Sequence, residues 1–361
     1  VFNWLNERNY KAILLCVKNS KLNETAISTN FKEYVYSVNY PHYFNLLAYY
    51  QIYKILKENN ISIVQTYKSS DIYSAVISGK LFGGLKKNGK IKPTIIHHLQ
   101  MLPSTNRTDF IHRWLYSHLD KIITITNECS EAVAEKWQIP KSKIKMIYYG
   151  ISPKDFNRDN LSLEQINSIK KKFNLPTDKK IISILGQITE GKGQRLLLEA
   201  FAELTKNRED CILTIVGRPP IGQDFFLEEL KNYAQLQKIN DKVFFLGFCE
   251  NPQYLLKITD IFVMASYNET FGWVVIEALA AGCITIGSNA GGVREIIEHN
   301  KNGFLFETKS KQSLLENLQI ALALNDLQKK EILKSAQETI NAKFTVEKFI
   351  NELTKLYNEF N

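Results

Sequence analysis

Short, continuous runs of Ile, Val and Leu alternate with helix-period segments along the whole chain. Such runs are typical of parallel strands buried on both faces, and the alternation predicts repeated βαβ units. A helical segment such as that of Leu197, Ala200, Phe201 and Leu204 follows i, i+3, i+4, i+7 spacing. The pattern predicts an α/β protein of doubly wound parallel sheets, with strands at 12–17, 61–64, 94–96, 121–125, 180–185, 212–216, 243–246, 261–264 and 284–286.

A length of 361 residues is more than one core usually organises, so we expect two domains. We expect the first at 1–150, joined by an amphipathic C-terminal helix at 345–361, and the second at 151–344. The polar stretch 152–179 is interpreted as the connection between them. The chain opens on helix-like residues that lead into the strand at 12–17, so the first domain is expected to lack its usual opening strand and Gly-rich turn.

The charge is unevenly distributed. Residues 1–150 hold 20 Lys and Arg against 10 Asp and Glu, whereas the remainder is nearly neutral. A cationic half is typical of proteins that meet nucleic acid, anionic lipid or phosphorylated substrates, and also of a plain solvated surface.

The membrane and metal signals are weak. No apolar run approaches the ~20 residues that span a bilayer, and the opening residues lack a signal-peptide pattern. The five cysteines are scattered, without CxxC or ligand spacing, so we expect reduced thiols, no metal site and a cytoplasmic location.

The stretch 267–282 carries two carboxylates, Glu269 and Glu277, around a Gly-containing loop and the expected start of a helix. This arrangement directs backbone N–H groups at an anion and leaves two acceptors for hydroxyl groups. Glu277 lies in an apolar setting, where a carboxylate is rarely buried without a partner. The alternative is a loop and a core helix with surface charges.

A second glycine-rich turn follows the strand at 180–185 and contains Gly186, Lys192 and Gly193. It matches neither the P-loop nor the GxGxxG pattern, and alone it would predict only a turn. Its position at the carboxyl end of a parallel strand, where ligands bind in open α/β sheets, favours an anion site. Two further strand ends, at 216–218 and 288–295, also carry Gly beside Arg or Glu.

The first half offers His98, at the end of the strand at 94–96, as an acid–base or orienting group. His97 points to the opposite face, so only one of the two can enter a cleft; a structural role for both is the alternative. The loop that follows contains basic and aromatic residues, namely Arg107, Phe110, Arg113 and Trp114. These residue types suit a membrane interface or a glycolipid acceptor, and a solvated loop is the alternative.

Taken together, these motifs resemble retaining glycosyltransferase family 4. The E-x7-E motif is Glu269 to Glu277, residues 120–126 resemble the family's "d-x-ii-x-v-S" strand, and 147–152 with Phe156 resemble its hinge entry. The resemblance covers the chain except its opening. It implies the GT-B fold, with two Rossmann-like domains facing a cleft, and transfer of a sugar from a nucleotide-sugar with retention and without an essential metal.

The resemblance also implies roles for individual residues. Glu277 would hold the ribose and Glu269 the donor sugar, the latter aided by the N–H groups of residues 270–272. The implied donor-binding set is Gly186, Gln187, Lys192, Arg218, Gly247, Phe248, Glu269, Thr270, Phe271, Gly272 and Glu277, and the implied catalytic set is Glu269, Lys192 and His98.

Two positions depart from the family pattern. Gln187 replaces the usual Arg, so Lys192 would carry more of the diphosphate charge, with Arg218 contributing. The family histidine maps to His98 or Gln100, depending on register.

We therefore expect a glycosyltransferase that uses a UDP-sugar and a glycan or glycolipid acceptor in cell-surface polysaccharide or lipopolysaccharide synthesis. We expect no cofactor and no nucleic acid, and expect peripheral contact with an anionic membrane. The alternatives are a GT-B phosphorylase or synthase on soluble sugars, a nucleic-acid-binding or -modifying protein that uses the basic half, and a partner-binding subunit without activity. A nicotinamide oxidoreductase is disfavoured because GxGxxG is absent.

Overall fold

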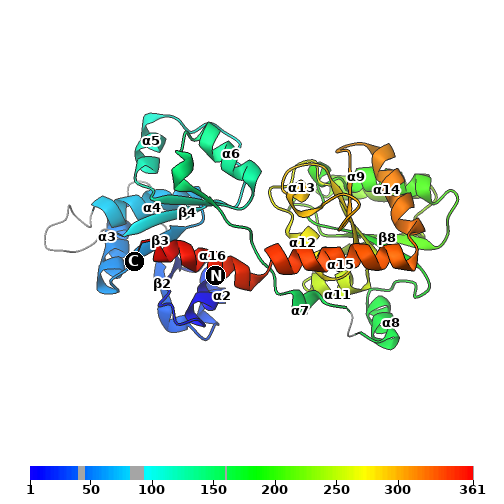
Figure 1. The fold of residues 1–361 in the computed structure, drawn as a ribbon, viewed down its shortest axis with the longest axis horizontal. Helices are drawn as coiled ribbons and strands as arrows, with labels where there is room; N and C mark the ends of the chain where they lie inside the picture. The colour runs from blue at the N-terminus through cyan, green and yellow to red at the C-terminus, as the bar shows by residue number, and fades with distance from the viewer. Residues whose placement is uncertain (40–44, 82–92, 159–160, 361) are drawn as a thin grey trace. The chain divides into compact units, whose positions relative to one another are not determined.

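A computed structural model describes residues 1–39, 45–81, 93–158 and 161–360. The chain forms two compact units (Figure 1). The N-terminal unit comprises Val1–Tyr148 and Glu347–Asn361, and the C-terminal unit comprises Tyr149–Val346.

The N-terminal unit contains two parallel sheets. In the first, β1 (Leu14–Val17) pairs with β2 (Val35–Val38). The second has the order β3-β4-β5-β6, formed by β3 (Ile63–Thr66), β4 (Thr94–His98), β5 (Lys121–Thr124) and β6 (Ile144–Met146). The side chains of β4 and β5 are almost all buried, as expected for parallel strands covered on both faces.

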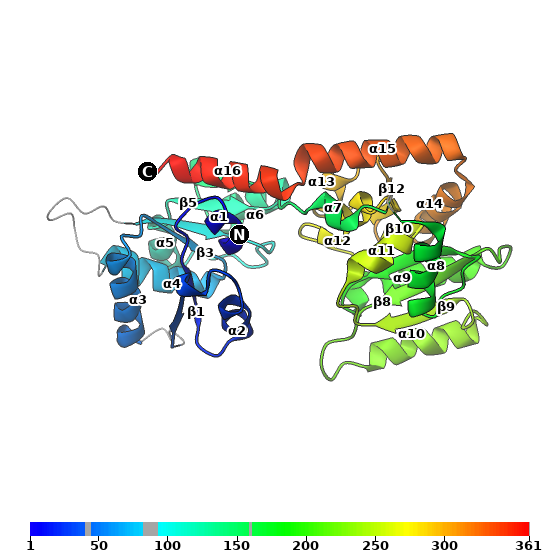
Figure 2. The same ribbon diagram turned by 90° about the horizontal axis from the view of Figure 1, so that it is seen from below.

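Helices surround these strands, and the last one returns from the end of the chain. They are α1 (Phe2–Asn6), α2 (Lys21–Ile27), η1 (Lys32–Tyr34), α3 (Leu46–Glu58), α4 (Ser69–Ala75), η2 (Val76–Leu81), α5 (Phe110–Ser117), α6 (Asn127–Lys136), η3 (Lys141–Lys143) and α16 (Val346–Asn358). The predicted amphipathic C-terminal helix is confirmed, since α16 buries Phe349, Leu353 and Leu356 against the unit (Figure 2).

The C-terminal unit is built on one six-stranded parallel sheet of order β12-β11-β10-β7-β8-β9. Its strands are β7 (Lys180–Leu185), β8 (Cys211–Val216), β9 (Val243–Gly247), β10 (Ile261–Met264), β11 (Ile284–Ser288) and β12 (Phe304–Phe306). The order reverses beside β7, which is the switch point where doubly wound sheets bind ligands.

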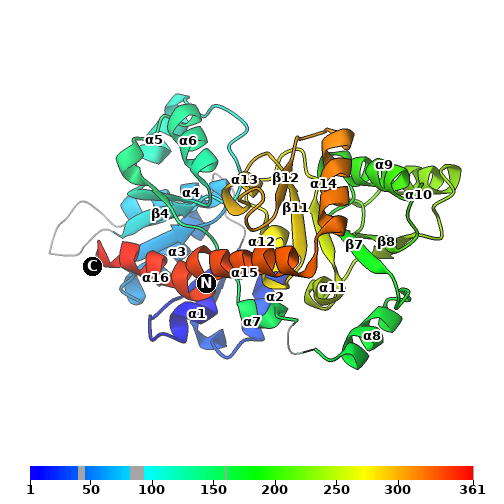
Figure 3. The same ribbon diagram turned by 45° about the vertical axis from the view of Figure 1, so that its right-hand side comes forward.

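The helices of this unit form two layers. They are α7 (Pro153–Phe156), α8 (Leu163–Lys172), η4 (Glu190–Lys192), α9 (Gln194–Leu204), α10 (Phe225–Leu236), α11 (Pro252–Ile258), α12 (Trp273–Ala280), α13 (Val293–Ile296), α14 (Lys311–Ala323) and α15 (Asp326–Lys343). Figure 3 shows α9, α10 and α14 grouped on one side of the sheet, with α8, α11 and α15 on the other.

The predicted fold class is confirmed in both units. The stretch 152–179, interpreted as the connection between the domains, contains α7 and α8, which pack on the C-terminal unit. Arg158 Nη1 donates to the Thr259 carbonyl at 3.0 Å, and the buried Lys170 Nζ donates to the Thr177 carbonyl at 3.0 Å. The polar composition of this stretch did not indicate that it makes these contacts.

Candidate functional site

Loops at the carboxyl ends of β7 and β8 are joined by close backbone contacts. Gly186 N–H donates to the Val216 carbonyl at 3.0 Å, and Ile188 N–H donates to the Arg218 carbonyl at 3.1 Å. A Cβ on Gly217 would lie 1.8 Å from the Gly186 carbonyl oxygen, and its φ of +140° is in the region that favours glycine. These glycines therefore allow the turn after β7 to pack directly against the loop after β8.

We expect Gly217→Ala to destabilise the C-terminal unit by about 1–3 kcal/mol from backbone strain alone, with the clash added. Gly191→Ala is the matched control, because a Cβ there meets no atom within 4 Å. Urea denaturation followed by circular dichroism measures both. Equal midpoints for the two variants would show that the close approach at Gly217 does not constrain the turn.

The far end of the β7 turn rests on the loop after β10. Tyr267 N–H donates to the Gly191 carbonyl at 2.9 Å. Gly193 has φ +73°, and a Cβ there would lie 2.1 Å from the Ala265 carbonyl oxygen. The turn that contains Lys192 is thus held against the loop that contains Glu269.

The loop after β11 completes the group. Gly292 N–H donates to the Glu269 carbonyl at 2.8 Å, and Ser288 Oγ lies 2.6 Å from the Ser266 carbonyl. A Cβ on Gly291 would lie 2.1 Å from the Glu269 carbonyl oxygen. Small residues at the strand ends therefore pack the loops of β7, β10 and β11 together.

Lys192 and Glu269, which the sequence placed 77 residues apart, form an ion pair of 2.7 Å between Nζ and Oε2. Their side chains are 36% and 19% exposed, so both remain reachable from solvent. A partly exposed ion pair of this kind contributes little to stability. Its members are therefore available to a ligand with an anion beside hydroxyl groups.

Glu277 lies in the same unit but is not at the start of its helix. It is the fifth residue of α12, after Gly272, which caps the helix at φ +96°. Its half-buried carboxyl has no ion pair or side-chain hydrogen bond to the described residues, and burial raises its pKa to about 7. Such a carboxyl gains from hydrogen-bond donors that a ligand brings.

Arg218, Gly247 and Phe248 come together at the ends of β8 and β9. The Arg218 guanidinium lies over the exposed Phe248 ring, 4.3 Å from its centroid, and Gly217 N–H donates to the Gly247 carbonyl at 2.7 Å. This pairing places Arg218 beside an aromatic surface. Gln187 has an exposed side chain, and its carbonyl accepts from Gln194 Nε2 at 2.9 Å.

His98 belongs to the N-terminal unit and is fully buried there. Its ring stacks on Tyr67, and Nδ1 lies 3.2 Å from Gln65 Nε2. Burial lowers the pKa of His98 to about 3, so the ring is neutral at pH 7. In this environment His98 can orient a group, but it is a poor proton donor. Its partner Gln65, which no sequence motif indicated, accepts a hydrogen bond from Tyr357 of α16.

The stretch selected as a membrane or acceptor loop is only partly a loop, because Phe110, Arg113 and Trp114 lie in helix α5. Phe110 is exposed, whereas the Trp114 ring packs against His118 in a tilted arrangement, 4.7 Å between centroids. Arg107 lies over the Trp137 ring at 5.3 Å, and Arg113 Nη2 donates to Gln138 Oε1 at 2.9 Å. Met101 and Ile111, which the sequence analysis did not single out, are exposed as well.

Metal ligands and membrane helices were also sought in the described ranges. There, no three His, Cys, Asp or Glu side chains are grouped so as to hold a metal ion. No helix in the same ranges combines the length and apolar character needed to cross a membrane.

Two family models match the two halves of the chain. The model described as Glycosyltransferase Family 4 matches residues 2–155, and the model described as Glycosyl transferases group 1 matches residues 165–339. The second match contains the loops that follow β7, β8, β9, β10 and β11.

Individual proteins are similar as well. An uncharacterized glycosyltransferase of Methanocaldococcus jannaschii is 30% identical over 240 residues, which are 66% of this chain and 59% of that protein. The N-acetylgalactosamine-N,N'-diacetylbacillosaminyl-diphospho-undecaprenol 4-alpha-N-acetylgalactosaminyltransferase of Campylobacter jejuni is 27% identical over 221 residues, 61% of this chain and 55% of that protein. This chain therefore spans less than two thirds of either relative's length.

Among solved structures, that of Anabaena HepE in complex with UDP superposes with a TM-score of 0.79 at 16% identity, over 96% of this chain and 99% of that chain. At this identity the likeness establishes the fold, which is GT-B.

Proposed function

We propose that this chain, a GT-B protein whose two halves match glycosyltransferase families, transfers a sugar from a UDP-sugar to a glycan or glycolipid acceptor with retention of configuration. The observation that carries the proposal is the Lys192–Glu269 pair at the β7 and β10 strand ends. An ammonium for phosphate and a carboxylate for sugar hydroxyls lie there side by side. The UDP bound to Anabaena HepE supports the choice of nucleotide.

In the proposed complex the donor lies across the strand-end loops. Lys192 and the Gly186 turn hold the diphosphate, while Glu269 and the N–H groups of residues 270–272 contact the sugar. Glu277 accepts hydrogen bonds from the ribose hydroxyls, which supply the donors that its desolvated carboxyl lacks. The base lies near Gly247 and against Phe248, where Arg218 already stacks.

The chemistry then follows from where charge develops. The bond between the anomeric carbon and the diphosphate oxygen breaks, and its electron pair leaves with the diphosphate. The acceptor hydroxyl oxygen bonds to the same face of that carbon, and its proton passes to the departing phosphate. Lys192 and the N-terminus of α12 stabilise the anion that forms. The proposal includes no cofactor and no resident metal.

The acceptor side of the proposal rests on the N-terminal unit. Residues 1–150 carry an excess of ten positive charges, and Phe110 is exposed beside basic residues. These features suit an anionic, amphiphilic acceptor at the cytoplasmic face of a membrane, in polysaccharide or lipopolysaccharide synthesis. The relative from Campylobacter jejuni, whose name specifies a diphospho-undecaprenol acceptor, supports that class. Nucleic acid is not a proposed partner.

A thermal-shift panel of UDP-, GDP- and ADP-sugars tests the donor assignment. We expect a UDP-sugar to raise Tm by mass action, and by the same amount in EDTA as in magnesium, because Lys192 and backbone N–H groups make the phosphate contacts. Inorganic phosphate at equal concentration is the control for general anion binding. Shifts with GDP- or ADP-sugars alone would reject UDP, and a shift that requires magnesium would reject the metal-free site.

A further inference from the structure

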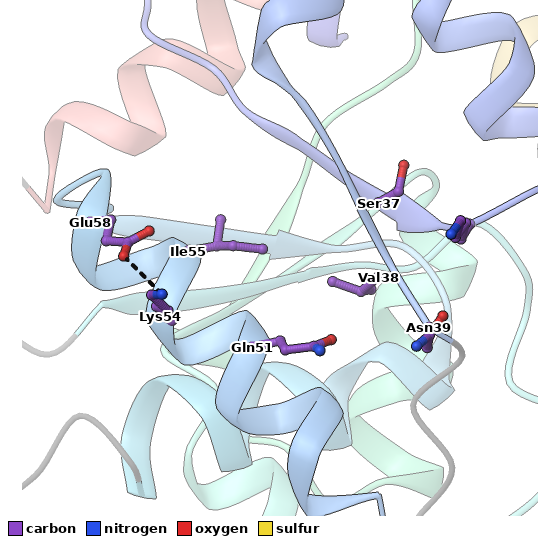
Figure 4. Close-up of a pocket in the computed structure, with 8 residues that line it drawn as sticks. Ser37, Val38, Asn39, Gln51, Lys54, Ile55 and Glu58 are labelled. Atoms are coloured by element: carbon purple, nitrogen blue, oxygen red, sulfur yellow. Dashed lines mark ion pairs between the residues drawn. The ribbon is translucent and has the colours of Figure 1, made fainter.

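The N-terminal unit contains a polar pocket of about 340 Å³ between β2 and α3 (Figure 4). It is lined by Lys18, Ser37, Val38, Asn39, Gln51, Lys54, Ile55 and Glu58. Lys18 directly follows β1, and Asn39 directly follows β2. Because β1 and β2 are parallel, the pocket lies at the carboxyl ends of both strands, where ligands bind in α/β sheets.

One face of α3 supplies half of this lining. Gln51, Lys54, Ile55 and Glu58 follow i, i+3, i+4, i+7 spacing, so they share a side of the helix. The helix packs into the unit through other residues, Ala48, Tyr49 and Ile52. The polar residues of this face, Gln51, Lys54 and Glu58, are exposed and therefore available to a ligand.

The lining chemistry suits a saccharide with a negative charge. The side-chain amides of Asn39 and Gln51 and the Glu58 carboxylate can exchange hydrogen bonds with neighbouring hydroxyl groups. Lys54 and Glu58 are 3.7 Å apart and both well exposed, so their mutual attraction is weak and either can turn to a ligand. With Lys18, the lining carries one more positive than negative charge.

An apolar surface lies on the first turns of the same helix. Leu46, Leu47 and Tyr50 are 66%, 78% and 55% exposed. Single exposed leucines are ordinary, but three large apolar side chains together beside Lys54 and Lys57 suit an anionic lipid surface. α3 thus presents a polar pocket and an apolar edge side by side.

We propose that this pocket binds the anionic saccharide of a membrane-anchored acceptor, with Leu46, Leu47 and Tyr50 against the lipid. The inference rests on the proposed function, since it names the residues that would bind the acceptor of the proposed sugar transfer. It also makes α3, together with the exposed Phe110, an element through which the N-terminal unit contacts the membrane.

Saturation-transfer NMR tests the saccharide part, with glucuronate as the probe, glucose as the neutral comparison and excess UDP to fill the donor site. We expect Gln51→Ala and Lys54→Ala each to raise the Kd for glucuronate about fivefold, the effect of losing one hydrogen bond. Lys57→Ala, at a lysine of α3 that is not among the pocket-lining residues, is the matched control. The UDP signal, read in the same tube, reports the donor site separately.

A glucuronate Kd that is the same in Lys54→Ala as in Lys57→Ala would overturn the saccharide site. Displacement of glucuronate by equimolar inorganic phosphate would reduce the pocket to an anion site. Loss of the UDP signal in every sample would instead count against the proposed function and not against the pocket.

Vesicle co-sedimentation tests the lipid part, with phosphatidylcholine vesicles that contain phosphatidylglycerol. We expect Leu46→Ser/Leu47→Ser to weaken binding about tenfold or more, given the transfer free energy of two leucines. Leu22→Ser, at an exposed leucine of α2, is the control. Equal sedimentation of the double variant and the control would overturn the proposal that the saccharide belongs to a membrane-anchored acceptor. The pocket would then be assigned to a soluble saccharide.

Discussion

Lys192→Ala is expected to lower kcat about 100-fold or more, the scale for removing one preorganised charge stabiliser. Lys192 is held 2.7 Å from Glu269 by a turn packed on the β10 loop, so its charge is already in position before the donor arrives. The neighbouring Gln187 contributes no charge, and Arg218 is engaged over Phe248. Few groups could therefore replace the ammonium at the leaving diphosphate.

Lys206→Ala is the matched control, because Lys206 also pairs with a glutamate, Glu203, at 3.0 Å in the same unit but on its exposed surface. We expect that variant to keep wild-type kcat. The double variant Lys192→Ala/Gln187→Arg should recover part of the loss, since it returns a cation to the turn. Steady-state kinetics on a verified donor and acceptor decide the matter, and equal kcat for Lys192→Ala and Lys206→Ala would remove Lys192 from the mechanism.

Glu277→Gln is expected to weaken UDP binding by about 1–3 kcal/mol, the cost of losing a hydrogen bond to a charged group. The ribose hydroxyls donate to the ionised carboxylate, and burial holds the pKa of that carboxyl at about 7 in the free protein. UDP affinity of the wild type should therefore rise as pH passes upward through 7, and the variant should lose this dependence. Calorimetry across pH 6 to 8, flanking the Glu277 pKa of about 7, measures it.

The same substitution should have the opposite effect on stability. The folded carboxyl has a pKa of about 7 against an ordinary value of 4.5, so the folded state holds a proton that the unfolded state loses. The free energy of unfolding of the wild type falls as pH rises from 4.5 to about 7. The glutamine amide of Glu277→Gln does not ionise, so the stability of this variant does not fall in this way. The variant should be more stable than wild type above pH 7 and similar to it below pH 4.5.

Glu331→Gln, at an exposed position of α15, serves as the control for both measurements. Unchanged UDP affinity in Glu277→Gln would place the ribose elsewhere. A stability curve parallel to that of Glu331→Gln would show that the Glu277 carboxyl is not desolvated.

The sequence was most informative where one local pattern decides the structure. The Ile- and Val-rich runs at 180–185 and 261–264 became β7 and β10 with the same bounds. Because parallel strands end at one edge of a sheet, strand-end motifs also predicted that Lys192 and Glu269 lie in one region. Three short strands escaped prediction, since Tyr36, Ser37 and Lys145 interrupt the apolar pattern of β2 and β6, and β12 has only three residues.

Features that depend on tertiary packing could not be predicted in the same way. Trp114 was expected on an amphiphilic loop, yet it lies in α5 and packs on His118. Arg107 lies on Trp137, a residue 30 positions away. The pocket beside α3 combines residues from three separate segments, each of which is ordinary surface by itself.

The central claim is that the strand-end loops of the C-terminal unit hold the nucleotide diphosphate. Amide hydrogen exchange with and without UDP tests this most directly, because it reports where the ligand lies without requiring an acceptor. We predict protection confined to residues 186–193, 216–218, 247–248, 269–277 and 288–292, and lost in Glu277→Gln at the same UDP concentration. Protection of the N-terminal unit alone, or an unchanged exchange pattern at saturating UDP, would contradict the account.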